Sequence, residues 1–111
     1  GNTAPNGTLL NYNNNLGDTT EVGKYPAGAS IYGALDMAGN VQEWVSDFFD
    51  AGYYYISPLS NPLGPDTGWL HIVRGGAWGD DDNGVRSSYR TTNLPSVEYN
   101  YIGFRCAMDA D

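Results

Sequence analysis

Glycine, asparagine and proline recur so closely along this chain that no long helix or strand fits between them. The 111 residues include 15 glycines and six prolines, and residues 1–34 show no helical period. Glycine and asparagine tolerate left-handed backbone, and proline cannot donate a backbone hydrogen bond, so all three favour turns. No repeat, low-complexity tract or linker divides the chain, and its length suits one domain. The sequence therefore predicts a single α+β unit over residues 1–111, with short strands, one or two short helices and much irregular structure.

A few apolar clusters indicate where the regular elements lie. Residues 40–49 predict a helix that Asn40 can cap. Its apolar positions recur at intervals of three and four, at Val41, Trp44, Val45 and Phe48, and we expect this stripe to pack in the core. Residues 70–75, 85–90 and 101–107 predict short strands. Residues 51–71, which contain three consecutive tyrosines and several prolines and glycines, predict a long ordered loop.

The chain is strongly acidic, with 13 acids, five Lys or Arg residues and a formal net charge of -8. Phosphate binding needs a basic face, so this charge argues against nucleic acid as the main partner. No apolar run approaches the roughly 20 residues that span a bilayer. The single cysteine, Cys106, cannot form an internal disulfide and leaves the cellular compartment open. We expect Cys106 to be buried, because it would share one strand face with Phe104.

The arginines are concentrated late in the sequence, in contrast to the single lysine, Lys24. All four lie within the last 40 residues, at positions Arg74, Arg86, Arg90 and Arg105. The planar guanidinium suits fixed, bidentate contacts. We therefore predict that these arginines pair with carboxylates and hold loops together, and an arginine that faces a ligand is the alternative.

No residue combination predicts a nucleophile with its base, and the one imidazole, His71, is expected to be a packed or surface side chain. Two oxygen-rich segments are more informative, because calcium takes about six to eight oxygen ligands. Residues 36–43 place Asp36 before a glycine turn and Glu43 after it, and residues 11–16 offer amides and carbonyls. Capped turns have the same composition, so spacing alone leaves calcium and ordinary turns as alternatives.

Several segments together resemble one known family. The segment Tyr32–Asp47 is similar to the signature G-L-x-D-M-x-G-N-V-x-E-W of the formylglycine-generating-enzyme, or sulfatase-modifying-factor, domain. The C-terminal half of that domain also resembles this chain at Asn11–Tyr12, Gly17–Gly23, Val73–Trp78, Val85–Arg90 and Ile102–Cys106. The resemblance implies a C-type-lectin-like fold. The family's full domain is longer, which makes this chain a minimal or partial version and the rest of a larger domain one partner to expect.

The resemblance also implies calcium as a cofactor. Carried over by position, one site would use the Asp36 and Glu43 side chains with the Gly39 and Val41 carbonyls. A second site would use Asn11 and Asn14 with the Tyr12 and Leu16 carbonyls. Catalysis does not carry over, because the positions of the family's copper-binding cysteine pair match Asp80 and Val85, and Cu(I) needs sulfur ligands.

The same superfamily contains the non-enzymatic variable proteins of diversity-generating retroelements, whose last segment presents a ligand-binding face. Tyrosines among small polar residues suit such a face, because they give large contact at low entropic cost. The residues that match it here are Trp78, Asp80, Asp81, Asp82, Asn83, Ser87, Tyr89, Tyr99, Asn100 and Tyr101. The sequence thus predicts a non-catalytic, calcium-stabilised domain that binds a protein or a hydroxyl-rich ligand. An oxidoreductase, diverged or fragmentary, is the alternative.

Overall fold

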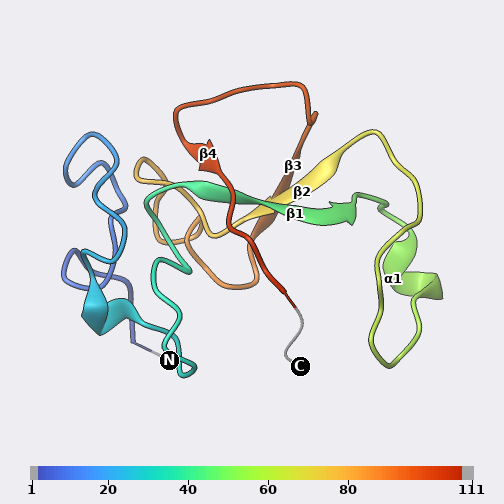
Figure 1. Cartoon of the computed structure of the whole chain (residues 1–111), viewed down its shortest axis with the longest axis horizontal. Coiled ribbons are helices and arrows are strands. Elements are labelled where there is room, and N and C mark those ends of the chain that lie inside the picture. The colour runs from blue at the N-terminus through green and yellow to red at the C-terminus, as the bar shows by residue number, and fades with distance from the viewer. Residues whose placement is uncertain (1–2, 109–111) are drawn as a thin grey trace.

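The computed structural model describes residues 3–108 as a small sheet surrounded by loops (Figure 1). In chain order its elements are the 3-10 helix η1 (Pro26–Gly28), β1 (Gln42–Phe48), α1 (Tyr53–Ile56), β2 (His71–Arg74), β3 (Arg90–Asn93) and β4 (Ile102–Gly103). The strands form one four-stranded sheet in the order β3-β2-β1-β4. Strand β2 is antiparallel to both β1 and β3, and β4 runs parallel to β1. The predicted class, α+β with short strands and much irregular chain, is confirmed.

The helix predicted over residues 40–49 is wrong, because this segment forms strand β1. Trp44 pairs with Val73 and Phe48 with His71, with a register shift between the two pairs. Such a bulge interrupts strict alternation, so apolar residues spaced three and four apart fit a bulged strand as well as a helix. Asn40 does not cap a helix but adopts left-handed backbone at φ 64°.

The later strands are shorter than the sequence predicts. Residues 85–89 form turns in place of the predicted strand, with Val85 N–H bonded to the Asp81 carbonyl and Tyr89 N–H to the Arg86 carbonyl, and β3 starts only at Arg90. Of residues 101–107, only β4 pairs with the sheet. The strand predicted at residues 70–75 is confirmed as β2, and the predicted loop 51–71 contains the single helical turn α1.

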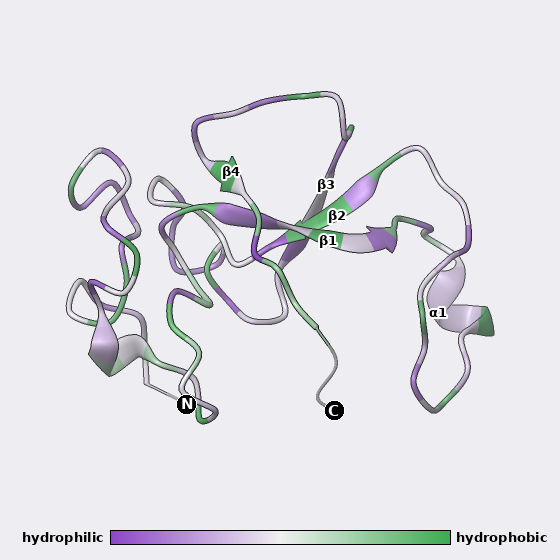
Figure 2. Cartoon of the chain, viewed as in Figure 1, coloured by the Kyte–Doolittle hydropathy of each residue, from purple (hydrophilic) through white to green (hydrophobic). Residues whose placement is uncertain are grey.

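The buried core is small and centred on β2. Its apolar members are Leu10, Ile72, Val73, Ala77 and Val85. Figure 2 shows green, hydrophobic stretches of β1 and β2 side by side at the middle of the sheet. Ile72 and Val73 are adjacent in one strand and therefore point to opposite faces, so both faces of β2 are covered. The expected core stripe of β1, including Trp44 and Phe48, is only half-buried.

Three further expectations concern Cys106, His71 and membrane-spanning segments. Cys106 is exposed, and so is Phe104 at 77%, so the predicted burial of this cysteine is wrong: β4 ends before it and no neighbour strand covers it. His71 packs against the Phe48 ring at 4.3 Å, as a structural histidine would. In the part of the chain that the structure describes, no helix has the length and apolar character to cross a membrane.

Candidate functional site

Two buried asparagines join three loops beside the candidate calcium site. Asn11 is 1% exposed and Asn40 7%. The Asn40 side-chain oxygen accepts from the Asn11 amide at 3.3 Å and from Thr20 N–H at 2.8 Å. The Asn40 backbone donates to the Asn11 carbonyl and accepts from Trp78 N–H, both at 2.8 Å. These bonds fix the turn that carries residues 36–43.

Glycine is required at the centre of this turn. Gly39 has φ +76°, and the Asn11 carbonyl oxygen lies where a side chain at position 39 would begin. Asp36, just before it, is also left-handed at φ 54°. Its carboxylate accepts a hydrogen bond from Gly23 N–H at 2.6 Å, which ties the turn to the preceding loop.

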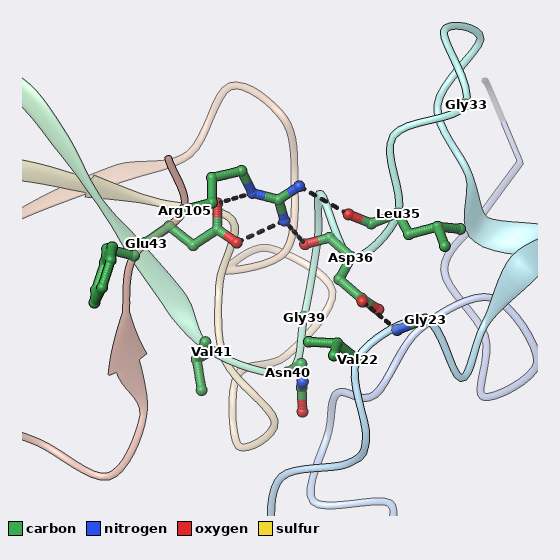
Figure 3. Close-up of a pocket in the computed structure, with 11 residues that line it drawn as sticks. Val22, Gly23, Gly33, Leu35, Asp36, Gly39, Asn40, Val41, Glu43 and Arg105 are labelled. Carbon is green, nitrogen blue, oxygen red and sulfur yellow. Dashed lines mark hydrogen bonds and ion pairs between the residues drawn. The ribbon is translucent and has the colours of Figure 1, made fainter. Parts of the chain in front are cut away.

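The four residues of the first expected calcium site lie around one cavity of about 530 Å³. These are Asp36, Gly39, Val41 and Glu43 (Figure 3). No hydrogen bond to the Gly39 or Val41 carbonyl is found among residues 3–108. One Asp36 carboxylate oxygen is taken by Gly23, and Figure 3 shows this side chain pointing toward that loop. The four residues that the sequence grouped thus line one cavity, and their use as calcium ligands stays a prediction.

The Arg105 side chain also lines this cavity, and its guanidinium forms an ion pair with the Glu43 carboxylate. Its Nε and Nη2 donate to the two Glu43 oxygens at 2.7 and 2.6 Å. The other guanidinium protons bond the carbonyls of Leu35 at 2.9 Å and Asp36 at 2.8 Å. The hydrogen bonds that Arg105 donates to the Glu43 carboxylate raise the pKa of Arg105. This arginine confirms the predicted role of tying loops, but its place inside the site was not predicted.

The cavity matches calcium in the type of its ligands. Carboxylate and carbonyl oxygens are what calcium takes, and a carboxylate has about four lone-pair positions, of which Arg105 uses two at Glu43. Among residues 3–108, no three His, Cys, Asp or Glu side chains gather closely enough to hold a metal by themselves. A calcium ion here would therefore depend on the Gly39 and Val41 carbonyls and would share Glu43 with the guanidinium.

The second expected set does not converge in the same way. Asn11 points inward, and its side-chain oxygen is buried without a hydrogen-bond partner among the described residues. The Tyr12 carbonyl accepts from Asn15 N–H at 3.0 Å. Asn14 and Leu16 are exposed. The structure thus brings the Asn11 side chain into the interior and leaves the Asn14 side chain, the other expected side-chain ligand, exposed.

The first part of the expected contact surface splits into inward and outward side chains. Asp80 turns inward, where its carboxylate accepts from Ala77 N–H at 2.8 Å and from the Gln42 amide at 3.0 Å. Trp78 is half-buried, and its indole N–H is buried without a partner in the region that the structure describes. Asp81 is exposed and caps its own turn.

The outward side chains form two groups. Asn83 and Tyr89 line a hollow of about 360 Å³ together with Arg86, Ser88 and Arg90. Separately, the rings of Tyr99 and Tyr101 stack at 4.9 Å and do not line that hollow. The remaining expected contact residues, Asp82, Ser87 and Asn100, are exposed. Of the residues around the hollow, Arg86, Ser88 and Arg90 were not among the predicted contacts, although the late arginines were noted as an alternative ligand-facing group.

A family model, described as a sulfatase-modifying factor enzyme 1-like domain, matches residues 3–110. The chain belongs to this family. Similar curated proteins include the serine/threonine-protein kinase Pkn1 of Chlamydia trachomatis, 43% identical over 94 residues, and the formylglycine-generating enzyme of Streptomyces coelicolor, 43% identical over 83 residues. The matches cover 83% and 72% of this chain but only 15% and 26% of those proteins.

A solved relative confirms the fold. The chain resembles Treponema denticola variable protein 1 with a TM-score of 0.72 and 28% sequence identity, over 87% of this chain and 34% of that one. The sulfatase-modifying factor family assignment and the relation to variable proteins, both predicted from the sequence motifs, therefore hold. The chain spans about a third or less of each of these three relatives.

Proposed function

We propose that this sulfatase-modifying factor domain is a non-catalytic, calcium-stabilised binding module that presents a ligand-contact surface between residues 78 and 101. The observation that carries the proposal is that some residues of this segment bond to the interior while others are exposed to solvent. Trp78 and Asp80 bond inward to the asparagine-linked loops, whereas Asn83, Tyr89 and Tyr99 are exposed. An anchored loop with outward tyrosines offers a rigid contact surface.

Calcium has a specific task in this proposal. The turn with Asp36 and Glu43 leads directly into β1, and its backbone is bonded to the segment that begins at Trp78. A cation shared by these two carboxylates and the Gly39 and Val41 carbonyls would stiffen the base of the contact surface.

The non-catalytic character is supported by the residues at the copper positions. Asp80 is used structurally and Val85 is buried at 6% exposure, and neither supplies a thiolate. The similarity to a formylglycine-generating enzyme favours the second candidate, an oxidoreductase. In that case the sulfur ligands and the remaining catalytic groups would have to come from outside this segment. Copper or iron bound in stoichiometric amount by the purified protein would favour that candidate and count against our proposal.

Binding is tested on an array of glycans and basic peptides, since acidic Asp81 and Asp82 favour basic or hydroxyl-rich ligands. We expect at least one saturable interaction that Tyr89→Ala weakens about tenfold or more, as truncation of an aromatic anchor does. Tyr55→Ala is the matched control, because Tyr55 is 92% exposed on α1. Binding that both variants weaken equally, or no saturable binding at all, would overturn the proposed contact surface.

A further inference from the structure

In the part of this acidic chain that the structure describes, three of the four arginines form no ion pair with a carboxylate. In the described part of the chain, the one ion pair within 4.0 Å joins Arg105 to Glu43. Arg74 ends β2 opposite Arg90, which begins β3, and Arg86 lines the same hollow as Arg90. The prediction that the late arginines pair with carboxylates is therefore wrong for these three.

The sheet register concentrates two of these charges on one face. Arg74 lies directly opposite Arg90 in the β2–β3 pair and opposite Glu43 in the β1–β2 pair. Residues directly opposite one another share a face, and like charges in that position destabilise a sheet. Glu43 could offset Arg74, but both of its oxygens accept from Arg105. Among residues 3–108, neither of the two adjacent guanidinium groups on this face has a carboxylate within 4.0 Å.

The direct contacts that these three arginine side chains make in the described structure are to neutral groups. Arg74 donates to the Ser87 carbonyl at 2.7 Å, and Arg86 donates to the Asn83 side-chain oxygen at 2.8 Å. The Arg90 guanidinium lies over the Tyr54 ring, 4.6 Å from its centroid. Cation–π and carbonyl contacts orient a guanidinium but do not neutralise it.

Arg86 and Arg90 then meet in the hollow of about 360 Å³, with Asn83, Ser88 and Tyr89. The hollow thus combines two cations with a hydroxyl, a phenol and an amide, all of which can donate hydrogen bonds. The backbone N–H groups of Gly84 and Asn83, and after them the Arg86 charge, lower the pKa of the nearby Asp81 carboxyl, but no ion pair joins Arg86 to Asp81. One Asp81 oxygen is already held by the N–H groups of Asn83 and Gly84, at 2.9 and 3.1 Å.

We propose that this hollow is an oxyanion subsite, in which Arg86 and Arg90 bind a carboxylate or phosphate group of the ligand. The proposal rests on the proposed binding function and specifies it further. A ligand that suits the whole surface would carry its anionic group at the Arg86–Arg90 hollow and its basic or hydroxyl groups near Asp81 and Asp82. The net charge of -8 then repels polyanions, while this local positive site binds a single anionic group.

The test is an NMR titration of the protein with inorganic phosphate in one arm and acetate in the other, at constant ionic strength. We expect saturable shifts at Arg86, Ser88 and Arg90, and the stronger response identifies phosphate or carboxylate as the source of the oxyanion. Arg86→Gln should weaken binding about tenfold or more, the typical loss of one charge-assisted contact. Because Arg86 is exposed and outside the sheet, this variant should keep the wild-type spectrum elsewhere.

Lys24→Gln is the matched control, since it removes the same charge from an exposed loop. Shifts that do not saturate in either arm, or an equal loss in Arg86→Gln and Lys24→Gln, would overturn the subsite. If an array ligand binds in a Tyr89-dependent way but phosphate and acetate cause no saturable shifts, the oxyanion subsite is wrong and the binding function stands. An oxyanion response without any array ligand would instead contradict the proposed function.

Discussion

Replacing Arg105 with glutamine should lower the free energy of unfolding by about 2–3.5 kcal/mol, because four hydrogen bonds from one guanidinium are lost. The Arg105 and Glu43 side chains are 38% and 22% exposed, so solvent screens the pair. We therefore assign about 1–1.5 kcal/mol to the ion pair and about 0.5–1 kcal/mol to each carbonyl bond. For a domain of this size, the melting temperature should fall by about 10 °C or more.

A double-mutant cycle separates the two contributions. Glu43→Gln alone should cost about 1–1.5 kcal/mol, and the double variant should be nearly as stable as Arg105→Gln, because the pair is already lost there. Urea unfolding of the four proteins measures the coupling energy. A coupling below about 0.5 kcal/mol, or an Arg105→Gln variant as stable as the wild type, would refute the idea that this arginine holds the loops together.

Three further variants test other parts of the framework. The Gly39→Ala variant should have a melting temperature at least about 10 °C below that of the wild type. Gly17 has a similar left-handed backbone but open space around it, so the melting temperature of Gly17→Ala should fall less. Asp80→Ala should cost about 1–3 kcal/mol in urea unfolding by orphaning two donors, and the exposed Asp82→Ala about none. Backbone N–H groups hold the Asp81 pKa below its usual 3.8. Asp81→Ala should therefore destabilise above pH 3.8, and thermal melts should converge as pH falls through the lower folded pKa.

The fold class and the family were predictable because they depend on local motifs. The turn with Gly39 and Asn40 has a backbone that few other residues adopt, so its sequence is distinctive. The secondary structure of residues 42–48 was not predictable from the same residues. The bulge spaces the apolar residues of this strand as a helix would, so their spacing fits both structures. The pairing with β2 is what makes the segment a strand.

The expected calcium residues Asp36 and Glu43 line one cavity, because they flank one turn. Arg105 was not placed with them, since it lies 62 residues from Glu43 in sequence and reaches it only through the parallel β1–β4 pair. The direction of the Asp80 side chain was also not predicted. It lies in a run of acids that looks like a polar loop, yet its carboxylate bonds inward to the Gln42 side chain of β1. Side-chain direction in an irregular loop depends on tertiary contacts that no local pattern encodes.

We propose that calcium bound at Asp36 and Glu43 holds the base of the binding surface. The most direct measurement is the melting temperature with excess calcium and with a chelator, for wild type and for Glu43→Gln. Calcium at about 100 times its dissociation constant should add about 2.7 kcal/mol, or about 10 °C or more, to the wild type. Glu43→Gln should show almost no calcium shift, while the control Glu98→Gln, at an exposed loop position, should respond like the wild type. A wild type that melts at the same temperature in both conditions, or a full calcium shift in Glu43→Gln, would contradict calcium binding at Asp36 and Glu43.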